Sequence, residues 1–269
     1  MGFAVFSMLF YVASILFITP MLLKAHSGEQ AKKPNKTLFF STALFAIVLH
    51  GLSLTPLFSH LFNEQDFTLI EISSLLSVIV AMLATCAIGF RVNTLWFLLP
   101  IVYCLAIINL ILQAFLPFSI IQHLSHNLGL FLHIGLALLA YALCFIATLY
   151  AVQLWWIDRN LKNKKLALSP IIPPLMTVER HFFRLMFSGE ILLTLTLISG
   201  AIYLPDFFAP HNVQKAVFSF LAWLEIGIAL IGHWKWHWRG KKMIIYCISG
   251  MILLSLAYFG SRVAFGRSL

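Results

Sequence analysis

The sequence predicts an all-α fold, a polytopic integral membrane helical bundle with eight transmembrane helices. Of its 269 residues, 61% are hydrophobic and only 10% are charged, whereas a soluble domain carries about 25% charged residues. The apolar residues form long unbroken runs, unlike the short alternating segments of a membrane β-barrel. A run of about 20 apolar residues can cross the hydrocarbon core as a helix, and eight such runs leave no room for a soluble domain.

The first four runs lie near 3–23, 38–57, 68–90 and 94–115. No positive charge precedes the first run, and its lysines follow it. A signal peptide has the reverse order, with its positive charges first. The first run is therefore predicted to be an uncleaved transmembrane helix, and the four helices form an N-terminal membrane half over 1–125.

The last four runs lie near 127–157, 182–204, 215–234 and 243–264, and they form a second half over 126–269 of one membrane domain. A loop is expected near 158–181, because Pro170, Pro173 and Pro174 cannot continue a helix. The stretch GHWKWHWRGKK over 232–242 ends the seventh run. Tryptophan and lysine side chains anchor helices at membrane interfaces, so we interpret this stretch as an anchor. The alternative is a pad that grips a flat ligand such as haem.

The positive charges predict the orientation of the helices. Fifteen of the eighteen lysines and arginines follow the first, third, fifth or seventh run, and Lys215, Arg262 and Arg267 are the exceptions. Basic loops of membrane proteins face the cytoplasm, so both termini are predicted on the outer, periplasmic side of an inner membrane. The net charge of +9 is thereby interpreted as a topology signal and not as a nucleic-acid-binding surface.

Two histidines lie inside predicted helices at nearly the same depth. At 1.5 Å per residue, His50 is roughly 18 Å from the cytoplasmic side and His133 roughly 9 Å from the outer side of a core about 30 Å thick. Two neutral imidazoles at one depth could be the axial ligands of a haem iron. His50 is then the preferred partner of His133 and His211 the reserve, whereas His233 lies too near the inner face. The alternative is that each histidine is hydrogen-bonded within the bundle.

Glu190 and Glu225 also come out nearly level, in the inner half of the membrane. An ionisable residue inside a transmembrane helix costs about 2.5 kcal/mol or more and is a functional candidate. Carboxyl groups at one depth can share a proton or hold a cation. The alternative is a neutral glutamate that is hydrogen-bonded to a neighbouring helix. Glu71, near the outer edge of the third run, is a further ionisable residue.

Enzyme motifs are absent from the sequence. It contains no H-E-x-x-H, no G-x-S-x-G, no P-loop and no C-x-x-C-H, which are the patterns of metalloproteases, serine hydrolases, nucleotide-binding proteins and haem-attachment sites. The four cysteines form no C-x-x-C pair. The sequence therefore predicts a protein that is not an enzyme.

Several segments in the second half together resemble the cytochrome c assembly family, in the branch related to CcsA. The resemblance covers about 127–262 and continues more weakly upstream through Glu71–Leu75. The segments that carry it are Leu132-His133-Ile134, Leu192–Gly200, Lys215–Trp223, Gly232-His233, Trp238-Arg239-Gly240 and Leu256–Ser261.

The resemblance implies a role in handling haem. By position, His133 corresponds to the outer-facing histidine of the family and His233 to the intramembrane histidine that ends the following helix pair. The family holds haem with a tryptophan-rich outer segment, but the corresponding stretch here, 205–214, contains no tryptophan.

The function expected from these features is a haem-binding or accessory factor without enzymatic activity. Its expected partners are membrane lipid, haem and other membrane proteins of cytochrome assembly, with no nucleic acid. A cation- or proton-coupled transport component, or a transport regulator, that uses Glu190 and Glu225 is the alternative.

Overall fold

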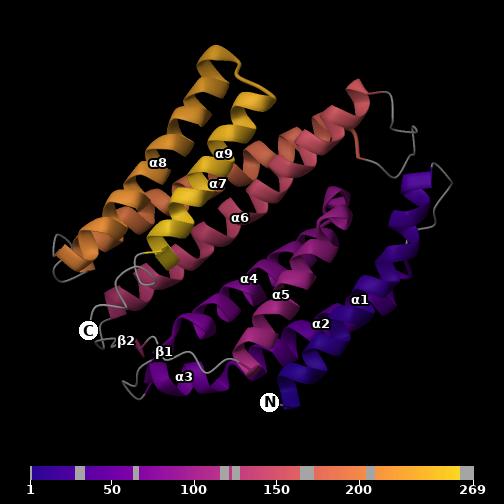
Figure 1. The fold of residues 1–269 in the computed structure, drawn as a ribbon, viewed down its shortest axis with the longest axis horizontal. Coiled ribbons are helices and arrows are strands. Elements are labelled where there is room, and N and C mark those ends of the chain that lie inside the picture. Colours follow the sequence, from indigo (N-terminus) through magenta and orange to yellow (C-terminus); the bar gives the residue numbers. More distant parts are fainter. Residues whose placement is uncertain are drawn as a thin grey trace. The chain divides into compact units, whose positions relative to one another are not determined.

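The protein is helical apart from one pair of two-residue strands (Figure 1). The computed structural model describes residues 2–27, 34–62, 67–115, 121–122, 128–163, 173–203 and 210–260. Its elements are α1 (Gly2–Ser27), α2 (Lys36–Ser53), α3 (Thr55–Phe62), β1 (Phe67–Thr68), α4 (Leu69–Gly89), the 3-10 helix η1 (Asn93–Phe97), α5 (Leu99–Phe115), β2 (Ile121–Gln122), α6 (Leu128–Lys162), α7 (Leu175–Tyr203), α8 (Pro210–Trp236), α9 (Lys241–Ser255) and the π-helix η2 (Leu256–Gly260).

The predicted all-α, polytopic membrane fold is confirmed. Within the described residues, seven helices are long and apolar enough to cross a membrane, and α5 is a shorter apolar helix of 17 residues. At 1.5 Å per residue α5 measures about 26 Å, slightly less than the roughly 30 Å of a hydrocarbon core. An eighth transmembrane helix therefore depends on whether α5 crosses the membrane. The count of eight transmembrane helices and the outward-facing termini stay predictions.

The span expected over 94–115 is not one helix. A 3-10 turn, η1, ends at Phe97, and α5 begins at Leu99. The interruption follows from Pro100, which has no N–H to donate and whose ring clashes with the carbonyl of a preceding helical turn. Proline is tolerated in the first turn of a helix, and that is where Pro100 lies.

The loop expected over 158–181 is shorter than predicted. Helix α6 continues to Lys162, where Lys162 Nζ lies 2.7 Å from Asp158 Oδ2 one turn earlier. Helix α7 begins at Leu175, directly after the two prolines. An apolar run indicates only the part of a helix that lies in lipid. The polar ends of α6 and α7 were therefore not predicted to be helical.

The chain divides into two compact units. Unit 1 comprises Met1–Leu124 and Ile157–Thr177, and unit 2 comprises Ser125–Trp156 and Val178–Leu269. The sequence placed a division between 125 and 126, without the return of 157–177 to the first unit. Whether the halves act as one membrane domain stays a prediction, and each unit is described below by itself.

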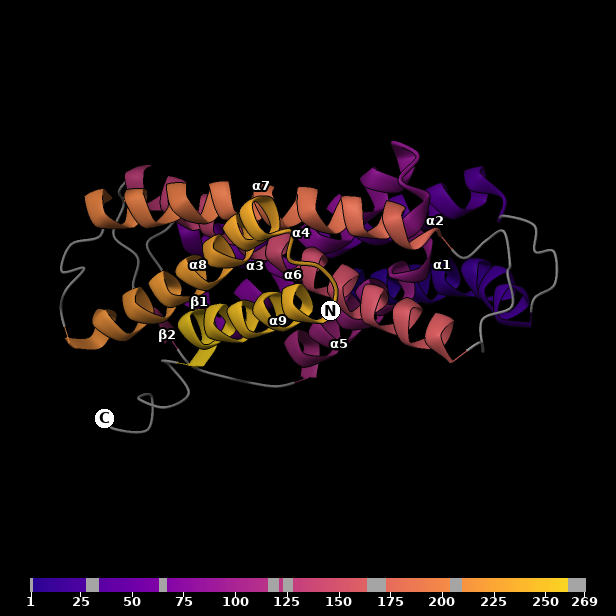
Figure 2. The same ribbon diagram turned by 90° about the horizontal axis from the view of Figure 1, so that it is seen from above.

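In unit 1, helices α1 and α2 lie side by side (Figures 1 and 2). The Ser7 hydroxyl on α1 donates to the Ala46 carbonyl on α2 at 2.7 Å. At the start of α4, Glu71 and Thr68 form a capping box, in which Thr68 N–H donates to Glu71 Oε2 at 2.8 Å. The capping box satisfies two free N–H groups of the helix end, which accounts for this ionisable residue at the edge of a span.

In unit 2, the α6, α7, α8 and α9 helices form an antiparallel bundle. Helix α6 contacts α7 at three heights: Gly129 against Tyr203, His133 against Ser199, and Cys144 against Gly189. It also contacts α9, since the Tyr141 and Ser255 hydroxyls lie 2.9 Å apart. Helix α8 lies beside α9 in both views (Figures 1 and 2), and its Trp223 indole N–H donates to Thr194 of α7 at 2.8 Å.

The distribution of polar side chains is that of a protein surrounded by lipid. Along one face of α1, Leu9, Leu16 and Leu23 are each exposed by 60% or more. His50 and Ser74 are completely buried in the same unit. Lipid accepts apolar side chains at no cost, whereas polar groups need partners inside the bundle.

Candidate functional site

His133 lies on α6 and faces α7. Its Nδ1 atom is 3.1 Å from the Thr196 carbonyl oxygen and 3.1 Å from Ser199 Oγ. A carbonyl oxygen only accepts, so Nδ1 carries the proton and Nε2 bears the lone pair. Within the described part of the chain, Nε2 makes no hydrogen bond. A histidine that binds a metal typically donates its other N–H to a carbonyl in this way.

His233 lies near the end of α8, at a different height of unit 2. Its ring stacks on Phe183 with 3.5 Å between centroids, and its Nδ1 donates to the Trp238 carbonyl at 3.0 Å. Phe183 precedes Thr196, the partner of His133, by thirteen residues on α7, which is roughly 20 Å of helix. The two histidines therefore cannot bind the same iron atom, as their predicted depths indicated.

His50 belongs to unit 1, and both of its ring nitrogens are paired. The Ser74 hydroxyl donates to Gln113 Oε1 at 2.7 Å, so it accepts from His50 Nε2 at 3.0 Å. The Tyr11 hydroxyl, 3.3 Å away, then donates to His50 Nδ1. His50 is thus hydrogen-bonded within the bundle, which is the alternative to iron binding that the sequence left open. To bind iron, His50 would have to give up the bond to Tyr11.

The predicted pairing of His133 with His50 or His211 stays a prediction. His133 lies in unit 2 and His50 in unit 1. The backbone of His211 lies in the first turn of α8, and its side chain is outside the described part of the structure.

The two intramembrane glutamates lie at the same height of unit 2. Glu190 Oε1 on α7 lies against Gly227 of α8, where an added Cβ would be only 3.1 Å away. Gly227 is two residues from Glu225, whose Oε1 accepts from the Ser249 hydroxyl of α9 at 2.7 Å. Each carboxyl group keeps a buried Oε2 with no hydrogen-bond partner among the described residues. A proton or cation shared between them stays a prediction.

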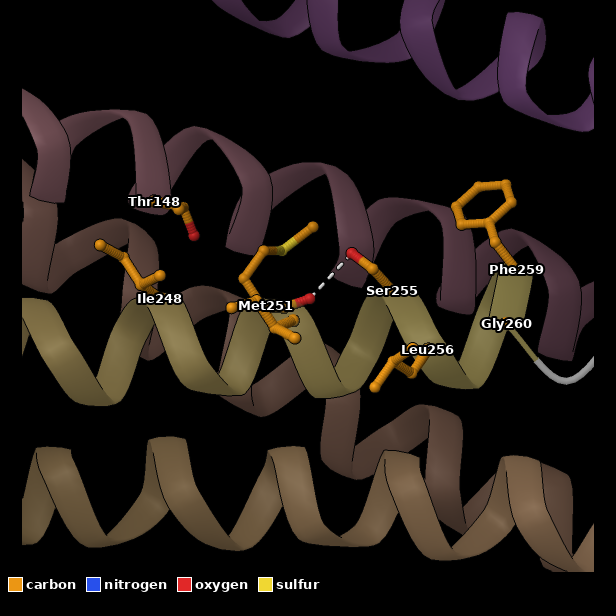
Figure 3. Close-up of a pocket in the computed structure, with 8 residues that line it drawn as sticks. Thr148, Ile248, Met251, Ser255, Leu256, Phe259 and Gly260 are labelled. Atoms are coloured by element: carbon orange, nitrogen blue, oxygen red, sulfur yellow. Dashed lines mark hydrogen bonds between the residues drawn. The ribbon is translucent and has the colours of Figure 1, made fainter.

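Unit 2 has an open apolar pocket of about 370 Å³, lined by residues of α9, the π-helix η2 and α6 (Figure 3). Thr148 of α6, Met251 and Phe259 line it, and the Ser255 hydroxyl donates to the Met251 carbonyl at 2.8 Å. No residue pattern predicted this pocket, because a π-turn has no pattern of its own. Its size falls within the range of small-molecule pockets, about 300–1,000 Å³.

No cluster of three or more His, Cys, Asp or Glu side chains is placed to hold a metal ion in the described ranges. A haem iron needs only one or two protein ligands. His133 and His233 of unit 2 each donate from Nδ1 to a backbone carbonyl and leave the lone pair of Nε2, but the ring of His233 is covered on one face by Phe183.

The fold and these sites define a polytopic membrane protein with polar groups inside its bundle. Residues 37–266 match the family described as Cytochrome C assembly protein. The chain is 39% identical over 262 residues to the inner membrane protein YpjD of Escherichia coli (strain K12), with 97% of each protein covered. It is 26% identical over 197 residues, covering 72% of this chain and 71% of the relative, to an uncharacterized 28.8 kDa protein in the nifR3-like 5′ region of Azospirillum brasilense. No solved structure matches it.

The chain therefore belongs to the cytochrome c assembly protein family, and it is a multi-pass inner-membrane protein. The family resemblance predicted over about 127–262 is confirmed. It extends further upstream than expected, to residue 37.

Proposed function

We propose that this protein is a haem-binding or accessory factor of cytochrome c assembly with no enzymatic activity of its own. Its partners are then haem, membrane lipid and other membrane proteins of cytochrome assembly, and nucleic acid is not among them. Membership of the family supports a role in this process. Haem would supply an iron with axial positions that an imidazole can fill.

The observation that carries the proposal is the hydrogen bonding of His133. The Thr196 carbonyl holds the Nδ1 proton, at 3.1 Å, and so orients the ring. The lone pair of Nε2 is left for an iron atom, and the carbonyl makes the imidazole a stronger ligand. The Ser199 hydroxyl donates to the same carbonyl at 3.0 Å, so it can accept from Nδ1 and help to fix the ring.

An absorption spectrum of the purified protein, with and without added haemin, tests the proposal. The wild type should show a Soret band, and His133→Ala should lose or shift it at unchanged protein level. His233→Ala should retain the band, and so should a variant with Trp234, Trp236 and Trp238 replaced by Phe. A band that survives His133→Ala and disappears in His233→Ala would move the site to the other end of unit 2.

The second axial ligand is decided by the same measurement on His50→Ala and His211→Ala. If His50 is the ligand, its replacement weakens the Soret band while a folded protein is still purified. If His211 is the ligand, His211→Ala weakens the Soret band, and His50→Ala only lowers the stability of the protein. The bond from Tyr11 to His50 Nδ1 favours the second result.

A second function, a cation- or proton-coupled transport component or regulator, is supported by Glu190 and Glu225. Each has a buried, unpaired carboxyl oxygen in the described residues, and an unpaired polar atom inside a membrane is costly unless it serves a ligand. A colourless protein whose ion binding or proton uptake is lost in Glu190→Gln and Glu225→Gln would favour transport. A Soret band that depends on His133, with no effect of these two changes on ion uptake, would favour haem.

A further inference from the structure

The connection between α8 and α9 is folded into a fixed turn. His237 and Gly240 have positive φ angles of 51° and 61°, which reverse the chain direction. The Trp238 N–H donates to the Gly232 carbonyl at 3.1 Å, and the Trp238 carbonyl accepts from His233 Nδ1 at 3.0 Å. The turn is therefore tied back to the last turns of α8.

Aromatic side chains make the turn rigid. The Trp238 ring lies against Gly232, where any Cβ would overlap it. It stacks on Tyr246 of α9 with 5.6 Å between ring centroids, and it lies 5.4 Å from the ring of Trp236. A flat ligand would have to displace these contacts, so Trp238 is part of a support and not an open pad.

This support carries an excess of positive charge. Lys235, Arg239, Lys241 and Lys242 are exposed, and Lys242 Nζ lies 5.3 Å above the Trp238 ring. The sequence has no aspartate or glutamate from 226 to 269. Arg239 Nε lies 3.3 Å from Glu179 Oε1 on α7, and this one carboxylate neutralises only one of the four positive charges.

Two of the lysines have no partner in the described part of the chain. Lys235 and Lys241 make no ion pair or hydrogen bond there. The ammonium of Lys242 is held in place by the Trp238 ring, because a cation is attracted to the face of an indole. An anion that binds here therefore meets charges that are already positioned and not yet neutralised.

The surface next to these charges is apolar. Trp234 and Trp236 are exposed by 58% and 60%, and Ile245 on α9 by 55%. The side chains at this end of α8 and α9 thus combine a lipid-facing surface with a cluster of cations. An amphiphilic anion fits both features, whereas a soluble anion uses only the charges.

We propose that the α8–α9 turn is a binding site for the phosphate of an anionic phospholipid headgroup. Lys235, Lys241 and Lys242 contact the phosphate, and the exposed tryptophans lie along the start of the acyl chains. The orientation predicted from the sequence places this headgroup in the cytoplasmic leaflet. Each lysine near an anionic surface contributes about 1 kcal/mol, which corresponds to about a fivefold change in affinity.

Native mass spectrometry of protein released from nanodiscs of equal parts phosphatidylglycerol and phosphatidylcholine tests the site. The wild type should retain phosphatidylglycerol in preference to phosphatidylcholine. The variant Lys241→Gln/Lys242→Gln should lose roughly 25-fold in that preference, at about fivefold for each lysine. The matched control is Lys36→Gln/Arg91→Gln, which removes the same charge from exposed positions that make no ion pair in the described residues and should keep the preference.

Equal retention of the two lipids by the wild type would overturn the proposal. An equal loss in the control variant would overturn it too, because the effect would then come from total charge and not from this turn. Release of the bound lipid by millimolar inorganic phosphate would assign the site to free phosphate instead. If the double variant does not purify as a folded protein, Lys241→Gln alone carries the test, with a loss of about fivefold.

Discussion

The buried ionisable groups of unit 1 and unit 2 differ in how they are paired, although the indole N–H of Trp96 in unit 1 is also buried without a partner in the described residues. In unit 1, the ring of His50 is paired at both nitrogens, and the chain of hydrogen bonds runs on through Ser74 to Gln113. In unit 2, His133 uses one ring nitrogen, and Glu190 and Glu225 each keep an unpaired oxygen among the described residues.

This difference distinguishes polar groups that hold helices together from polar groups that can bind a ligand. A closed network inside a membrane bundle fixes which helix faces meet, since every donor has found its acceptor. An unpaired lone pair in the same surroundings is a cost that a ligand can remove. The His50 network of unit 1 is thus explained by the fold, and the unpaired lone pairs of unit 2 call for a ligand or a proton.

The largest expected effect is that of His50→Ala. It removes a fully buried ring and breaks the bonds to Tyr11 and Ser74, which should lower the free energy of unfolding by about 3 kcal/mol, mostly through the cavity. Unfolding in mixed micelles measures it, with Leu44→Ala, at an exposed position of the same helix, as the control. Equal stability of the two variants would mean that the His50 network does not hold unit 1 together.

A smaller effect is expected from Gly189→Ala in unit 2. An added Cβ would lie 2.8 Å from Cys144 Sγ, so we expect a loss of about 1–3 kcal/mol from overpacking between α6 and α7. Gly135→Ala on α6 is the matched control, because nothing lies within 4 Å of its added Cβ. Adding Cys144→Ala should restore most of the stability, and a failure to do so would place the strain elsewhere.

Trp223→Phe should have a smaller effect still. The change removes the hydrogen bond from the Trp223 indole N–H to Thr194 Oγ1 at 2.8 Å, which is worth about 0.6 kcal/mol between membrane helices, and it removes part of the indole packing on Phe220. The same unfolding experiment measures it. A loss as large as that of His50→Ala would show that unit 2 also depends on a polar network for its packing.

The smallest effect on stability is expected from single cysteine substitutions in loops, which test the orientation of the helices. In a background without the four native cysteines, Lys164→Cys should be shielded from an impermeant maleimide in intact cells, because its loop is rich in lysine and arginine. Asn63→Cys should be labelled. Labelling of Lys164→Cys together with protection of Asn63→Cys would mean that the predicted orientation is inverted.

The helices were predictable from the sequence because lipid demands a minimum length of apolar residues. The ends were not, since Asp158 and Lys162 prolong α6 through an ion pair in water and Pro100 interrupts a run that is apolar throughout. The short β1–β2 pair has too few residues to produce a pattern.

Within unit 2, the relative heights of the candidate residues were predictable, but the directions of their side chains were not. Rise per residue gave the heights of Glu190 and Glu225 and the separation of His133 from His233. The rotation of each helix about its axis decides which neighbour a side chain meets, and rotation depends on the packing of all the helices in a unit. The partners Thr196 of His133 and Tyr11 of His50 therefore appeared only in the structure.

The contact of Trp238 with Gly232 has a consequence for how this protein can change over evolution. The indole ring fills the space that a side chain at position 232 would need, so glycine cannot be replaced at 232 while Trp238 remains. An alanine at 232 requires a smaller residue at 238, and the stack on Tyr246 is then lost as well. Among relatives, a tryptophan at the position of 238 should accordingly occur with glycine at 232, and a homologue with a side chain at 232 should have a smaller residue at 238.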